Sequence, residues 1–213
     1  MAELPQSPTA LEDLADYRRS VAGMYARVRQ GDLPVAQRWE AFRRERDALF
    51  ASHAQSALSP EQKQTFTGLT YFEYDPAYRF IIPVETAADP KILEVDLPDE
   101  GLLRLQRFGR ISFEVGGQRV SLSVFWVKSY GGGIFLPFRD LTYQNETYGG
   151  GRYLLDTIKN ADLGRAAGGL VVDFNFAYNP SCAYNPRWVC PLPPPENRLS
   201  VPIRAGELKF SDE

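Results

Sequence analysis

The sequence predicts an α+β fold that is mainly β, namely an antiparallel β-barrel or sandwich preceded by an N-terminal helical arm. Three observations support this prediction. Apolar residues recur at helical spacing before residue 67. From Tyr71 onward, short segments rich in β-branched and aromatic residues are separated by turn residues. No long helical pattern separates these segments, as it would in a parallel sheet. We therefore expect a helical arm over 1–67 and a β-rich, barrel-like domain over 68–213.

Three helices are expected in the arm. The first has Thr9 and Glu12 at the N-cap and N3 positions of a capping box, and Gly31 in position to end it. A third, short helix begins at Ser59, with proline at its first position and Gln62 at N3. The arm lacks a second layer of its own, so it should pack against the sheet or across a dimer.

The second helix, from about Pro34, has an apolar face that includes Trp39 and Phe42. Its other face has charges of both signs, which we interpret as solvated rather than phosphate-binding. The charged members are Arg38, Glu40, Arg43, Arg44, Glu45, Arg46 and Asp47.

Strands follow at short intervals. The dipeptide Gly116-Gly117 predicts a tight hairpin between two of them. Residues 156–165 could form one short helix. The expected strands are 78–84, 91–97, 102–108, 111–115, 119–127, 133–138, 169–174 and 200–203.

Composition excludes several function classes. The net charge of −3 lacks the basic surplus of a nucleic-acid binder, and no apolar run approaches the roughly 20 residues that cross a membrane. The first residues lack the charged and apolar regions of a signal peptide, so we expect a cytoplasmic protein. His53, Cys182 and Cys190 are too few for a structural zinc site, which takes four ligands. We expect no metal and no cofactor, and reduced thiols.

The first candidate segment for a site contains Arg139, then Thr147-Tyr148-Gly149-Gly150-Gly151, then Arg152 and Tyr153. It has neither a P-loop lysine nor a GxGxxG pattern. The glycines suit sharp turns. Arg152 can pair with Asp140 or Asp156 as a structural ion pair, or bind a carboxylate or phosphate of a ligand.

The second candidate segment runs from Asp173 to Asn197. Asp173 and Asn175 are two residues apart, so in a strand they point to the same side. The prolines that follow make the segment stiff. Its polar side chains can bind a ligand or can satisfy irregular backbone; they are Asp173, Asn175, Asn179, Glu196 and Asn197, with Tyr178 beside them.

Cys182 is the candidate nucleophile. A reactive cysteine needs a neighbour that lowers its pKa, and His53 is the only histidine. A Cys–His pair would require the arm to fold over the β-domain. A buried, inert thiol and a redox pair with Cys190 are the alternatives, and carboxylate chemistry could use Asp173 and Glu196.

These segments together resemble a bacterial and archaeal family catalogued as domain of unknown function 1684. The resemblance covers roughly residues 12–207 and includes His53-Ala54-Gln55-Ser56-Ala57-Leu58, where the family more often has prolines at the two alanines. It implies that the quoted residues, His53 among them, are the family's signature. It implies no reaction and no cofactor.

Two functions remain open from the sequence. One is a small-molecule-binding domain, with or without enzymatic activity. The other is a non-catalytic structural or interaction domain whose arm makes a homodimer. Catalytic candidates are Cys182, His53, Asp173 and Glu196. The predicted ligand-binding residues are Arg139, Arg152, Tyr153, Asp173, Asn175, Tyr178, Cys182, Glu196 and Asn197.

Overall fold

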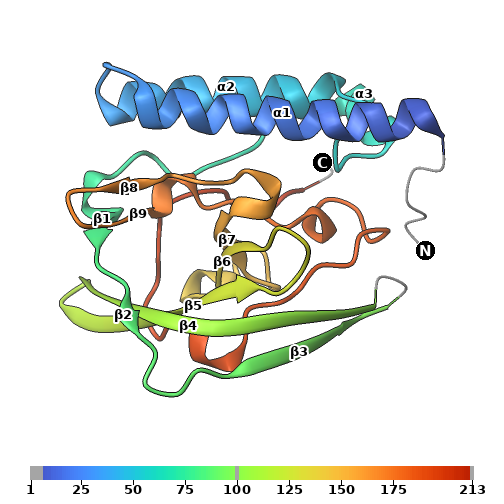
Figure 1. The fold of residues 1–213 in the computed structure, drawn as a ribbon. Helices are drawn as coiled ribbons and strands as arrows, with labels where there is room; N and C mark the ends of the chain where they lie inside the picture. Colours follow the sequence, from blue (N-terminus) through green and yellow to red (C-terminus); the bar gives the residue numbers. More distant parts are fainter. Residues whose placement is uncertain (1–6, 99–100, 212–213) are drawn as a thin grey trace.

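The computed structural model describes residues 7–98 and 101–211. Helices α1 (Pro8–Gln30) and α2 (Val35–Ser52) run antiparallel in one layer, with the short α3 (Pro60–Thr65) at one end (Figure 1). The strands lie below this layer. No helix in the described ranges is long and apolar enough to span a membrane.

Local sequence explains the helix ends. The Ser7 side chain caps α1 by accepting a hydrogen bond of 3.1 Å from the Ala10 amide. The predicted Thr9 capping box is therefore wrong, because the helix has already begun at Pro8, whose missing N–H costs nothing at that position. Gly31 ends α1 as expected, and α3 has the predicted box between Ser59 and Gln62.

The strands form two antiparallel sheets. The smaller has the order β1 (Arg79–Ile82), β9 (Gly169–Asp173), β8 (Arg165–Ala166). The larger has the order β2, β4, β5, β6, β7, and β3 pairs with β4. Its strands are β2 (Glu85–Thr86), β3 (Ile92–Leu97), β4 (Gly101–Val115), β5 (Gln118–Val127), β6 (Gly133–Phe138) and β7 (Arg152–Asp156). Within the described ranges no named strand of one sheet pairs with a strand of the other, so the sandwich form of the predicted α+β fold is confirmed and the barrel is not closed.

The long β4–β5 hairpin confirms the glycine turn. Gly116 and Gly117 have φ of 57° and 73°, the left-handed values that a two-residue turn of this kind requires. The two strands predicted at 102–108 and 111–115 are one strand, whose register with β5 shifts between Arg107 and Gly109. Gly109 lies against β2, where a Cβ atom would stand 2.2 Å from Val84 Cγ1.

Two local predictions are wrong, and one strand was not predicted. Residues 156–165 form no α-helix, because β7 continues to Asp156 and only a three-residue 3₁₀ turn, Thr157–Lys159, follows. Residues 200–203 form no strand; their backbone instead meets the turn at 140–141, where Leu141 N donates to Val201 O at 3.2 Å. β7 itself was not predicted, because its apolar residues follow the glycine run directly.

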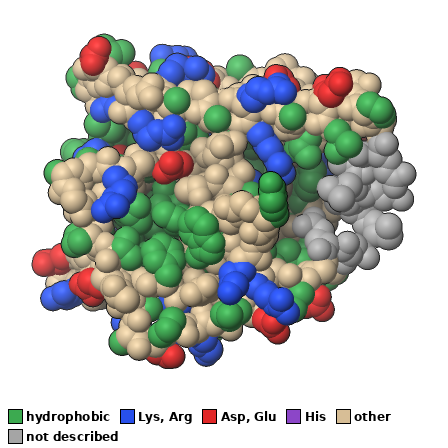
Figure 2. Space-filling view, in the orientation of Figure 1, with side chains coloured by type: hydrophobic (Ala, Val, Ile, Leu, Met, Phe, Trp, Pro, Cys, Tyr) green, Lys and Arg blue, Asp and Glu red, His purple; other side chains and the backbone are tan. Residues whose placement is uncertain are grey.

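One hydrophobic core joins the helices to the strands. Val21, Met24, Trp39 and Phe42 belong to the same buried cluster as residues of β4, β5 and β9. The Phe42 and Phe176 rings pack edge to face at 5.2 Å. The helical layer thus covers the smaller sheet (Figure 1), and hydrophobic side chains are visible at the open side of the sandwich (Figure 2).

The sequence predicted a solvated charged face on α2, but part of this face is buried. Arg46 is only 7% exposed, and its guanidinium binds Glu207 Oε2 at 3.2 Å and the Tyr184 hydroxyl at 3.1 Å. Glu207 also accepts hydrogen bonds from Tyr184 and Asn179. This buried network, Arg46–Glu207–Tyr184–Asn179, ties α2 to the C-terminal segment.

Candidate functional site

The predicted site residues lie in five separate places rather than in one pocket. Each place has its own hydrogen-bond partners, so each is described in turn. The groups are Arg152 with Asp140; Arg139, Glu196 and Asn197; Tyr153, Tyr178 and Cys182; His53; and Asp173 with Asn175.

Arg152 acts as a structural brace. It is 1% exposed, and its guanidinium binds Asp140 Oδ1 at 3.2 Å and the Ile203 carbonyl at 2.9 Å. A further nitrogen donates to the carbonyls of Ala205 and Glu207. Of the two partners that the sequence suggested, Asp140 is the one in contact. Arg152 therefore fixes the C-terminal segment on β7 with no face open to a ligand.

Asn197 and Glu196 hold the proline-rich segment to the larger sheet. Asn197 is fully buried; its side chain accepts from Ser123 N at 2.8 Å and donates to the Ser123 and Pro137 carbonyls. Glu196 lies 3.4 Å from Arg107. The Arg139 backbone pairs with residues 197–199, and its guanidinium lies over the Tyr143 ring. These contacts match the bracing alternative for this segment.

Cys182 lies beside Cys190 and Tyr148. The Cys182 amide donates to Cys190 Sγ at 3.4 Å, and the Tyr148 hydroxyl donates to Cys182 Sγ at 3.6 Å. Tyr153 and Tyr178 pack edge to face nearby, with the Tyr153 hydroxyl bonded to the Pro191 carbonyl at 2.7 Å.

His53 is engaged on the helical arm. Its Nδ1 accepts from Gln55 N at 3.0 Å, and its Nε2 lies 3.5 Å from Asp16 Oδ2. Both ring nitrogens thus have partners other than Cys182, and the predicted Cys–His pair is not formed.

Asp173 and Asn175 lie where β9 ends beneath the helices. Asn175 is fully buried and donates to Asp173 Oδ1 from both its backbone N at 3.0 Å and its Nδ2 at 2.8 Å. The Asn175 side chain also accepts a hydrogen bond from the Asp75 amide and donates one to the Asp75 carbonyl. The Asn175 backbone carbonyl accepts from Trp39 Nε1 at 2.8 Å. Asn175 therefore fixes one carboxylate oxygen of Asp173 and leaves the other free.

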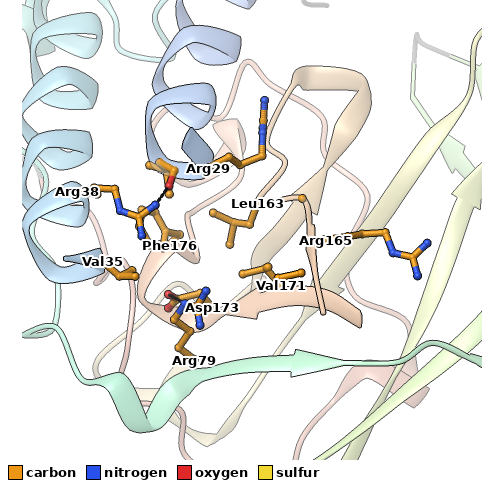
Figure 3. Close-up of a pocket in the computed structure, with 12 residues that line it drawn as sticks. Arg29, Val35, Arg38, Arg79, Leu163, Arg165, Val171, Asp173 and Phe176 are labelled. Atoms are coloured by element: carbon orange, nitrogen blue, oxygen red, sulfur yellow. Dashed lines mark hydrogen bonds and ion pairs between the residues drawn. The ribbon is translucent and has the colours of Figure 1, made fainter. Parts of the chain in front are cut away.

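A cavity of about 170 Å³ opens between the helices and the smaller sheet at this point. In Figure 3, Arg79 lies against Asp173 and Arg38 lies farther off on the same cavity, whereas the guanidinium groups of Arg29 and Arg165 lie at its margin and point away. Arg29 contacts Asp162. The apolar lining is Val28, Val35, Leu163, Ala166, Val171 and Phe176.

Two polar atoms on this cavity lack a hydrogen-bond partner. Asp173 Oδ2 is buried without one, with Arg79 Nε 3.6 Å away, beyond hydrogen-bond distance. Arg38 Nε is also buried without one, while another nitrogen of Arg38 donates to the Val28 carbonyl. Buried polar groups nearly always have partners, so an unpaired acceptor and an unpaired donor on one cavity indicate a place for a polar molecule.

Burial changes the acidity of Asp173. Its removal from water raises the pKa of Asp173 to about 6, against the opposing effects of the Asn175 hydrogen bonds and the Arg79 charge. The carboxylate at the floor of the cavity is therefore an acceptor at neutral pH and a donor in mild acid. It can receive a proton or a hydroxyl hydrogen bond from a bound molecule.

Arg38 and Arg79 were missed by the sequence reasoning. Arg38 was assigned to the solvated face of its helix, and Arg79 was read only as a strand residue. Arg79 is the direct partner of Asp173 in the β1–β9 pairing. No local signal marks this relation, because it depends on the pairing of two distant strands.

Other places offer less. A hollow of about 490 Å³ on the outer face is lined by Ile92, Glu94, Arg104 and Lys128, of which Arg104 and Glu94 already pair at 2.9 Å. Within the described part of the chain, no group of three or more His, Cys, Asp or Glu side chains is arranged to hold a metal.

Comparisons with known proteins identify the family. A family model described as "Protein of unknown function (DUF1684)" matches residues 64–208. A solution NMR structure of an uncharacterized protein from Haloarcula marismortui is 33% identical and aligns with a TM-score of 0.56, over 81% of this chain and 92% of that one. The comparison with curated proteins found no match. The family model spans well over half of the sequence, and the chain belongs to the family of proteins of unknown function DUF1684.

Proposed function

We propose that the protein is a small-molecule-binding domain whose ligand occupies the cavity at Asp173. The ligand is a small anion that also carries a hydrogen-bond donor, and protonated phosphate is the simplest example. The observation that carries the proposal is the pair of unsatisfied buried atoms on this cavity, Asp173 Oδ2 as acceptor and Arg38 Nε as donor.

Charge and size favour this class of ligand. Arg79 lies beside the carboxylate, and Arg38 supplies a second positive charge to the same cavity, so an anion gains more than it loses from the local field. The volume of about 170 Å³ is smaller than that of typical drug-sized pockets. It suits a phosphate-sized group, alone or at the end of a longer molecule that extends past Arg29 and Arg165.

The carboxylate gives the site a means of selection. A phosphate with a P–OH group can donate to Asp173 Oδ2 while its other oxygens accept from the arginines. Sulfate is similar in size and geometry but has no proton to donate at neutral pH, and it would place an oxygen against the carboxylate. A site whose carboxylate must accept a hydrogen bond from the ligand discriminates against an analogue, such as sulfate, that has no hydrogen to donate.

The test is thermal unfolding with phosphate or sulfate at matched ionic strength. A ligand that binds only the folded state raises the melting temperature in a concentration-dependent way. We expect a larger rise with phosphate than with sulfate in the wild type, loss of this difference in Asp173→Asn, and loss of both effects in Arg79→Gln. Arg104→Gln, on the outer hollow, is the matched control and should behave as the wild type.

Several results would contradict the proposal. Equal shifts of the melting temperature with the two anions, or an unchanged phosphate preference in Asp173→Asn, would mean that Asp173 does not distinguish phosphate from sulfate. No concentration-dependent shift with either anion would mean that the cavity holds only ordered water, which also satisfies such atoms.

A further inference from the structure

The cysteine pair plays no part in the proposed anion site. Cys182 belongs to the 3₁₀ turn Ser181–Ala183, Cys190 follows it by eight residues, and both are partly exposed. The Cys182 amide donates to Cys190 Sγ at 3.4 Å. Since this nitrogen is bonded to the Cys182 Cα, the second sulfur already lies against the backbone of the first cysteine.

The segment around both cysteines is held in place. The Tyr153 hydroxyl binds the Pro191 carbonyl at 2.7 Å, next to Cys190. Between the cysteines, Trp188 Nε1 donates to the Ala57 carbonyl at 3.3 Å, and Arg187 reaches the Ser56 carbonyl at 3.5 Å. The two thiols are therefore kept together by contacts with β7 and with the α2–α3 connection, and not by a bond between them, as both are free.

The two thiols differ in acidity. The hydrogen bond from Cys190 lowers the pKa of Cys182 to about 6; the Tyr148 hydroxyl at 3.6 Å acts in the same direction, and partial burial opposes both. The pKa of Cys190 is raised, because its proton is shared with the neighbouring thiolate and because it is buried. Near neutral pH the pair therefore holds one thiolate and one thiol, which is the arrangement that an attacking and a resolving cysteine require.

We propose that Cys182 and Cys190 are a redox pair that closes to an intramolecular disulfide on reaction with a hydroperoxide. The Cys182 thiolate attacks the terminal oxygen, the O–O bond breaks, and Cys182 becomes a sulfenic acid while hydroxide or alkoxide leaves. The Cys190 sulfur then attacks the Cys182 sulfur, the S–O bond breaks, and the Cys190 proton leaves with the hydroxyl as water. Two equivalents of a low-molecular-weight thiol return the pair to its reduced form and are themselves oxidised to a disulfide.

The first test follows the thiols by intact-protein mass spectrometry after hydrogen peroxide treatment and alkylation. The wild type should lose both alkylation sites together and weigh two hydrogens less, and dithiothreitol should restore both sites. Cys190→Ser should instead accumulate a sulfenic acid at Cys182 that dimedone traps. Cys182→Ser should keep its Cys190 thiol under the same treatment.

The second test measures the alkylation rate of Cys182 against pH in Cys190→Ala and in the wild type. We expect a wild-type midpoint near 6 and a higher midpoint in Cys190→Ala and in Tyr148→Phe, because each change removes a hydrogen bond to the thiolate. Tyr130→Phe is the control, as Tyr130 is fully exposed.

The outcomes decide the question even if one variant fails to fold. A wild type that keeps two alkylatable thiols after peroxide, or that forms only dimers through disulfides between molecules, overturns the proposal. A Cys182 midpoint at the value of an ordinary thiol, or a failure of dimedone to label folded Cys190→Ser, does so too. None of these measurements depends on anion binding.

Discussion

At the scale of single residues, three of the buried charged groups have different surroundings: Arg152, Arg46 and Asp173. Arg152 has Asp140 and several carbonyls around it, and Arg46 has Glu207. Asp173 has only one of its oxygens bonded. The first two are structural, because each is paired with a buried carboxylate of the chain. Asp173 differs from them because it also lines a cavity.

Asp173 should make the folded state less stable as the pH rises. Its pKa is raised to about 6 in the folded protein, from an ordinary value of 3.8. The folded state therefore holds the proton over a window in which the unfolded state has lost it, and stability falls as pH rises from about 4 to about 6. The loss is roughly 3 kcal/mol at 1.36 kcal/mol per pKa unit.

Urea unfolding across this window measures the effect. The wild-type free energy of unfolding minus that of Asp173→Asn should decline between pH 4 and pH 6 and then level off. A constant difference between the two proteins across the window would show that Asp173 ionises normally.

Arg152→Met should be strongly destabilising. It leaves Asp140 buried at 2% exposure without its cation and removes the bonds to the C-terminal segment. Breaking a buried pair in this way costs about 3–5 kcal/mol. Chemical denaturation measures the loss, and Arg204→Met, which removes an exposed pair with Glu146, should change stability by less than about 1 kcal/mol. Similar values for the two variants would contradict the bracing role.

At the scale of elements, the helices and most of the strands follow from local patterns. The two glycines at 116–117 fix the β4–β5 hairpin, and the Ser59 and Gln62 pair fixes the start of α3. The errors occur where tertiary contacts decide. Residues 200–203 have a strand-like composition, but the Ile203 amide donates to Asp140 Oδ2 at 2.6 Å. This amide is therefore not paired with a neighbouring strand.

The candidate site was only partly predictable, for the same reason. Asp173 and Asn175 were found because polar residues interrupt an apolar strand. Arg79 could not be found, because it meets Asp173 only through strand pairing. Arg38 could not be distinguished from its charged neighbours on α2, since which of them faces the sheet depends on how the helix docks.

The pairing of β2 with β4 should depend on Gly109. A Cβ there would stand 2.2 Å from Val84 Cγ1 and 2.9 Å from the Glu85 carbonyl oxygen. Gly109→Ala should therefore lower the free energy of unfolding by about 1–3 kcal/mol, as overpacking does. Gly149→Ala is the matched control, because nothing lies within 4 Å of its Cβ position. Equal melting temperatures for the two variants would show that β2 moves aside freely.

At the scale of the whole molecule, the helical layer shares its core with the sheets. Val21, Met24, Tyr25 and Val28 of α1 are buried in the main cluster. The apolar face of α1 is thus covered within the chain. The dimer suggested by the arm stays a prediction, which the solution mass of the full chain tests.

Removal of residues 1–33 should abolish cooperative unfolding rather than only change the solution mass. The deletion uncovers the core beneath α1, including the Phe42 ring, which packs on Tyr25 at 5.1 Å. Near-ultraviolet circular dichroism and a melting curve measure the effect. A truncated protein with a sharp transition at the wild-type temperature would contradict it and would mark the arm as an accessory to an independent β-domain.

The buried network of Arg46 and Glu207 also has a consequence during synthesis. The two residues are 161 positions apart, so a long stretch of translation separates the emergence of α2 from that of its counter-ion. Until Glu207 leaves the ribosome, α2 cannot bury Arg46 without leaving a charge unpaired in the interior. The nascent helical layer therefore lacks this ion pair until Glu207 has been synthesised.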